Sequence, residues 1–164
     1  MTTRYPIVVI GVGNEFRTDD GAGLYAARKI KEIGLEYVRV IEGVSDGTSL
    51  MEAWEDSTLT FVIDCAVSKA SPGTVYRFDI ASDKIPGGLF GSYSTHAINV
   101  TDTVELARIL RRLPPRLIIY GIEGNNFTPG NTLSPVVKEK AEQVARNVIE
   151  EIRQFLLEIA TTDK

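Results

Sequence analysis

The chain has 164 residues, 43% of them apolar, and a net charge of −4. This length fits one domain, residues 1–164, with a genuine hydrophobic core, and the negative charge argues against nucleic acid or an anionic membrane as a partner. The single cysteine, Cys65, excludes an internal disulfide framework, and no apolar run approaches the ~20 residues of a membrane helix. Because the N-terminus also lacks the apolar core of a signal peptide, we expect a cytoplasmic protein. We also expect the chain to be a monomer.

The first predicted element lies in residues 7–23, which read IVVIGVGNEFRTDDGAG. Residues 7–10 are an unbroken, mostly β-branched run, which is typical of a strand buried on both faces. Asp19 and Asp20 follow a glycine turn and precede a helix predicted over residues 21–33, where the helix dipole favours negative charge. A helix cap requires only one acid: we expect Asp19 to be the cap or a supporting acid, which leaves Asp20 available for another role.

Four further elements follow. A strand is predicted over residues 37–41, and a short helix behind it contains Met51 and Trp54, which we interpret as core residues. The apolar strand over residues 59–63 resembles the first and ends in Asp64. Residues 73–79 alternate in character, which predicts an edge strand, and the short connection before it favours an antiparallel direction.

The rest of the chain adds a loop, two helices and a strand. Residues 81–100 show no period and contain His96, the only histidine. A capping box at Asp102 and Glu105 predicts a helix that stops at the prolines 114–115. A strand over residues 117–121 follows, and Ser134 with a proline at the first helical position begins a helix that runs to about residue 160.

Alternating strands and helices predict an α/β fold with three layers, α/β/α. The expected sheet has five strands, is mostly parallel, and carries one antiparallel edge strand. If the strand order begins 2-1-3, a crevice opens at the carboxyl ends of strands one and three, where open α/β proteins place their ligands. Asp20 follows strand one and Asp64 ends strand three, so both acids reach this crevice, and the loop with His96 can fold over it.

Two carboxylates and one imidazole form an open three-ligand site for a divalent first-row metal. Other templates fit less well. Gly11-Val12-Gly13 begins like a dinucleotide fingerprint, but Phe16 stands where the third glycine belongs. Cys65 and His96 could pair as thiol nucleophile and base, although a small apolar thiol at a strand end is more often buried packing.

The quoted residues carry a resemblance to a known family. The string GVGNEFRTDDGAG, the later VIDCAVS around Asp64, and Tyr93-Ser94-Thr95-His96 closely resemble the nickel-iron hydrogenase maturation endopeptidases, over most of the chain. The resemblance implies that Asp20, Asp64 and His96 are the catalytic and metal-contacting residues. The metal it implies is nickel already inserted into the precursor of the hydrogenase large subunit, from which the enzyme removes a C-terminal peptide.

Two departures from the family pattern stand out. Many relatives carry a compact Asp-Gly-Gly-Thr-x-Gly string after the second strand, whereas here Glu42-Gly43 and Asp46-Gly47-Thr48 are spread apart. This difference bears on which hydrogenase is processed. Cys65 stands where relatives often have alanine, a change that should leave the chemistry unaltered.

The residues leave several mechanisms and functions open. Nickel can hold the scissile bond in place, polarise its carbonyl or activate water, or Asp20 or Asp64 can act as a general base, so the endopeptidase is either aspartyl-type or metal-assisted. Asn14 can orient its loop or contact the substrate. Two other functions compete with this one: a metallohydrolase that carries its own divalent metal, and a non-enzymatic module that docks nickel or the precursor.

Overall fold

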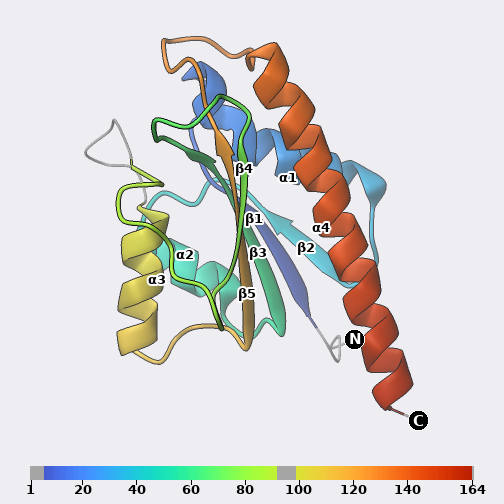
Figure 1. Ribbon diagram of the computed structural model, residues 1–164. Helices are drawn as coiled ribbons and strands as arrows, with labels where there is room; N and C mark the ends of the chain where they lie inside the picture. Colours follow the sequence, from blue (N-terminus) through green and yellow to red (C-terminus); the bar gives the residue numbers. More distant parts are fainter. Residues whose placement is uncertain (1–5, 92–98, 164) are drawn as a thin grey trace.

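The fold is organised around a five-stranded sheet, shown in Figure 1; the computed structural model describes residues 6–91 and 99–163 of the chain. In chain order the elements are β1 (Ile7–Gly11), the 3-10 helix η1 (Thr18–Gly21), α1 (Ala22–Ile33), β2 (Val38–Ile41), α2 (Gly47–Trp54), β3 (Leu59–Ala66), β4 (Val75–Asp79), α3 (Val100–Ile109), β5 (Arg116–Glu123) and α4 (Pro135–Thr162). None of the helices in the described ranges has the length and apolarity needed to cross a bilayer.

The strand order is β2-β1-β3-β5-β4. The first four strands are parallel, and β4 pairs antiparallel with β5 at the edge of the sheet. The predicted mostly parallel sheet, its 2-1-3 start and its antiparallel edge strand are therefore confirmed. Although β4 directly follows β3 in the chain, the two strands are not neighbours in the sheet. After β4 the chain passes through α3 and returns as β5, which lies between β3 and β4.

Helices cover both faces of the sheet, α1 and α4 on one and α2 and α3 on the other (Figure 1). Successive residues of β1 alternate between the two layers: Ile7 and Val9 pack with α1 and α4, whereas Val8 and Ile10 pack with α2 and α3. A strand covered on both faces needs apolar residues at every position, which explains the unbroken run. The three-layer architecture is confirmed, and so is the core role of Met51 and Trp54, which lie in the α2 and α3 layer.

Several predicted boundaries are wrong; α3, for example, ends at Ile109, well before the prolines 114–115 predicted to stop it. Helix α3 starts at Val100, not at Asp102, and Asn99 is its N-cap: Oδ1 of Asn99 accepts a 3.2 Å hydrogen bond from the Asp102 backbone N–H. Asn and Asp are both good N-caps, and the fully buried Val100 adds a core contact that extends the helix toward its N-terminus. Strand β3 continues to Ala66, so Asp64 lies inside the strand rather than at its end.

Candidate functional site

Glycines allow α1 to sit directly against the ends of β1 and β3. A Cβ atom on Gly23 would lie 2.1 Å from the carbonyl oxygen of Ile63, and one on Gly11 would lie 2.7 Å from the Cβ of Ala27. Neither position has room for a side chain. The close approach brings η1, which directly precedes α1, over the carboxyl edge of the sheet, at the top in Figure 1.

Asp20 lies in η1 and is half-buried. Its Oδ2 accepts a 3.1 Å hydrogen bond from the backbone N–H of Asn14, so the loop between β1 and η1 folds back onto the acid. Gly13 makes this possible because it has a φ of +134° and because a Cβ there would lie 2.0 Å from the backbone oxygen of Asp20. Oδ1 of Asn14 accepts a hydrogen bond from the Phe16 N–H, so in this structure Asn14 serves to shape the turn.

Asp64 also lies close to Gly13. A Cβ atom on Gly13 would lie 4.0 Å from Oδ1 of Asp64 as well as 2.0 Å from the Asp20 backbone oxygen, so both acidic residues approach the same glycine. The Asp64 side chain is buried, and Oδ1 accepts a 2.8 Å hydrogen bond from the Cys65 N–H. The structure therefore brings Asp20 and Asp64 together, as the strand order predicts.

Burial raises the pKa of both carboxyl groups, and the charge of Asp20 adds to the effect on Asp64. Burial raises the pKa of Asp20, against the lowering effects of the Asn14 hydrogen bond and of the positive charge on Arg17. Burial, and then the negative charge of Asp20, raise the pKa of Asp64 well above its usual range. A carboxyl pair in this environment either keeps a proton or binds a cation, which makes it suitable both for metal ligation and for proton transfer.

His96, the third predicted site residue, lies outside the described residues. Within residues 6–91 and 99–163, no group of three or more His, Cys, Asp or Glu side chains is arranged to hold a metal ion. The described part of the candidate site is thus a pair of carboxylates, and the assignment of Asp20, Asp64 and His96 as catalytic and metal-contacting residues stays a prediction.

Asp19 has a role that sequence reasoning described only as a cap or a supporting acid. It is fully buried, and its carboxylate accepts four hydrogen bonds from the loop between β5 and α4. The donors are the N–H groups of Asn125 and Asn126, both at 2.8 Å, and the N–H and hydroxyl of Ser134, both at 2.7 Å. Ser134 is the N-cap residue of α4, as predicted, but its hydroxyl is directed to Asp19 and does not cap the helix. Asp19 therefore joins two loops that border the site.

Cys65 does not act as a nucleophile in this arrangement. The thiol is buried, and burial is the main cause that raises its pKa, with a further contribution from the negative charge of Asp64. A protonated, inaccessible thiol is a poor nucleophile. The interpretation of Cys65 as core packing is confirmed.

A pocket of about 440 Å³ lies beside the acids. It is lined by Gly13, Asn14, Glu15, Phe16, Leu24, Arg28, Glu42 and Gly43. Arg28 of α1 spans it: its guanidinium donates to Glu15 at 2.7 Å and to Glu42 at 2.5 Å, so it links the loop after β1 to the loop after β2. Sequence reasoning did not identify Arg28 or Glu15, because their contacts join separate segments of the chain.

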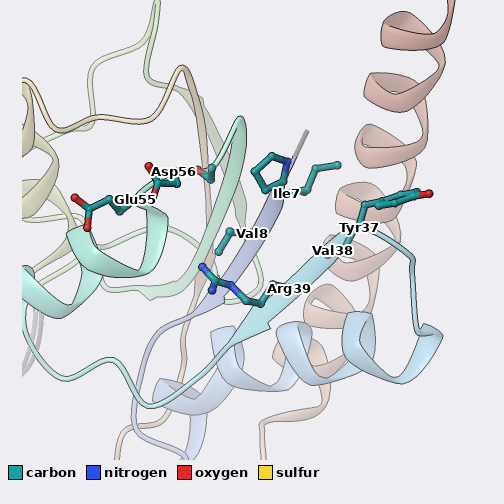
Figure 2. Close-up of a pocket in the computed structure, with 9 residues that line it drawn as sticks. Ile7, Val8, Tyr37, Val38, Arg39, Glu55 and Asp56 are labelled. Atoms are coloured by element: carbon teal, nitrogen blue, oxygen red, sulfur yellow. The ribbon is translucent and has the colours of Figure 1, made fainter. Parts of the chain in front are cut away.

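A second pocket, of about 460 Å³, lies at the opposite edge of the sheet, near the amino ends of β1 and β2 (Figure 2). Arg39, Glu55 and Asp56 contribute its charged groups. The candidate acids line neither pocket, but the first is lined by Asn14, whose backbone N–H donates to Asp20, whereas the second has no such link to them. Ligands of open α/β folds bind at the carboxyl ends of the strands, so we assign the candidate site to the pocket and acids at that edge.

Comparisons with known proteins agree with this fold. The model of a family described as hydrogenase maturation protease matches residues 24–151. The chain is 24% identical over 151 residues to the hydrogenase 2 maturation protease of Escherichia coli, covering 90% of this chain and 91% of that protein. It is 25% identical over 153 residues to the hydrogenase expression/formation protein HupD of Thiocapsa roseopersicina, covering 91% of this chain and 68% of that protein.

Among solved structures, the hydrogenase maturating endopeptidase HybD from E. coli superposes with a TM-score of 0.76. The match covers 91% of this chain and 93% of HybD at 24% identity, so it establishes the shared fold.

Proposed function

The chain belongs to the hydrogenase maturation protease family, and we propose that it removes a C-terminal peptide from the nickel-loaded precursor of a nickel-iron hydrogenase large subunit. The observation that carries the proposal is the pairing of Asp20 with Asp64 at the carboxyl edge of the sheet. That the enzyme works in the cytoplasm as a monomer belongs to the same proposal.

Nickel enters this reaction as part of the substrate. Asp20 and Asp64 supply carboxylate oxygens, and His96 would supply an imidazole nitrogen, a donor set that suits divalent first-row metals. The raised pKa of Asp64 fits this role, because a buried carboxyl pair without a cation holds a proton and gives it up when positive charge arrives. The site would therefore distinguish a precursor that contains nickel from an empty one.

The two acids are not equivalent. Asp20 is the more exposed of the two and is held by the loop that faces the pocket, so it is the side chain that meets the precursor first. Asp64 is fixed in β3 at the floor of the site. Nickel polarises the scissile carbonyl or activates water, or one of the acids takes the proton from the attacking water; in each case Asp20 and Asp64 set the position of the reacting bond.

The test is to incubate the protein with nickel-loaded and nickel-free precursor and to measure the precursor mass. We expect loss of a C-terminal peptide from the nickel-loaded form alone. Asp20→Asn, Asp64→Asn and His96→Ala should each slow processing at least a hundredfold, on the scale of a lost catalytic group. Asp56→Asn, which alters an acid at the opposite edge of the sheet, is the matched control and should process normally.

Two outcomes would contradict the proposal. If no nickel-loaded precursor is shortened, the assigned reaction is wrong. If all three variants retain full activity, the assigned site is wrong. Metal analysis of the purified protein addresses the remaining alternative, since a stoichiometric resident ion would favour a metallohydrolase with its own metal.

A further inference from the structure

Phe16 is a large apolar side chain that the fold leaves in solvent. It is 68% exposed and lies in the loop between β1 and η1, the loop that leads to Asp20. The phenylalanine also lines the pocket beside the acids. Single exposed apolar residues are common, so the exposure of Phe16 does not by itself indicate a function. Its surroundings do indicate one.

The backbone that carries Phe16 is fixed before any partner binds. Its N–H donates to Oδ1 of Asn14 at 2.9 Å, and its carbonyl accepts from the Gly130 N–H at 2.9 Å. The next residues continue the attachment, since Arg17 forms a parallel bridge with Gly130 and the Thr18 N–H donates to the Gly130 carbonyl at 2.8 Å. A rigid loop that presents an aromatic ring has a low ordering cost on binding.

The rest of the pocket supplies polar walls around this ring. Arg28 is engaged by Glu15 and Glu42 within the protein, and these three side chains form a charged rim. Among the described residues with exposed large apolar side chains, Phe16 is the one that lies in the loop delivering Asp20. A polar rim around one apolar contact is the usual arrangement of a binding hot spot.

We propose that Phe16 anchors the precursor by contacting an apolar side chain in its C-terminal segment, close to the scissile bond. This inference rests on the proposed function. Because the loop that carries Phe16 leads directly into η1, which carries Asp20, a peptide bound at Asp20 has neighbouring residues within reach of the ring. Phe16 thus determines which precursors bind productively, and the acids act on those that do.

The experiment compares cleavage of the nickel-loaded precursor by the unmodified chain and by variants. Phe16→Ala should lower kcat/KM about ten- to a hundredfold, mainly through a higher KM, because the apolar contact is lost while the acids stay in place. Phe16→Leu should stay within about threefold of the unmodified chain. Leu157→Ala removes another exposed apolar residue, 62% exposed on α4, and should leave kcat/KM unchanged.

A double-mutant cycle identifies the contact. Apolar residues of the precursor's C-terminal segment are replaced one at a time by Ala, and one such change should cost little further in the Phe16→Ala background. The anchor is refuted if the unmodified chain cleaves the precursor and Phe16→Ala cleaves it equally well, if only kcat falls, or if Leu157→Ala causes the same loss. Failure of the unmodified chain to cleave any nickel-loaded precursor would instead refute the proposed function, and the anchor with it.

Discussion

Replacing Asp19 by Ala should strongly destabilise the fold. The carboxylate is fully buried and accepts four hydrogen bonds of 2.7–2.8 Å, three of them from backbone N–H groups that would lose their partner. A hydrogen bond to a charged group contributes roughly 1.5–3 kcal/mol, but the four share one side chain and water can enter the vacated space. We therefore expect the free energy of unfolding to fall by about 4 kcal/mol.

The assay is urea unfolding at pH 7 followed by the fluorescence of Trp54, the single tryptophan, which is 1% exposed in the folded chain. Asp20→Asn is the matched control: it alters the adjacent acid, which accepts one hydrogen bond, and should change the free energy of unfolding by less than about 1 kcal/mol while impairing processing. A loss below about 1 kcal/mol for Asp19→Ala would refute the assignment of Asp19 as the residue that joins the two loops.

Two further predictions concern the floor and the packing of the site. Because burial raises the pKa of Asp64 above its ordinary value of 3.8, its contribution to stability is full below that pH and is lost as pH rises through the folded-state pKa. In metal-free buffer, Asp64→Asn should be more stable than the unmodified chain at pH 8, with the difference disappearing near pH 4; a constant difference across urea titrations at both pH values would contradict this. Gly23→Ala, whose Cβ would lie 2.1 Å from the Ile63 oxygen, should lower the free energy of unfolding by about 3 kcal/mol or more. Gly87→Ala, with open space around the new Cβ, should change it by less than about 0.5 kcal/mol, and equal shifts in thermal melting would refute the packing argument.

The parts of the fold that depend on local pattern could be predicted from the sequence. The apolar runs of β1 and β3 indicate strands buried on both faces, and the alternation of elements indicates a parallel sheet, which is what the structure has. The approach of Asp20 to Asp64 follows from that topology, because parallel neighbours end at the same edge. The start of α3 could not be decided locally, since Asn99 and Asp102 are both suitable caps.

The contacts that depend on distant segments were beyond sequence reasoning. Asp19 finds its partners 106 to 115 residues further along the chain, so its neighbours in sequence carry no sign of its role. The same holds for Arg28, whose partners Glu15 and Glu42 come from two other segments. Phe16 was visible only as the residue that breaks a glycine pattern, because side-chain exposure is a property of the folded chain.

The attachment of the loop after β1 to the loop after β5 has a consequence for engineering. Hydrogen bonds of Asp19, Thr18 and Gly130 join the two segments into one structural unit, and each segment both donates and accepts. Exchanging residues 12–18 alone between members of this family, in order to transfer substrate preference, would leave the incoming segment without the hydrogen-bond partners that fit it in the loop after β5. Residues 124–134 should travel with it, so the smallest transferable unit of this site comprises two pieces of chain that are remote in sequence and continuous in space.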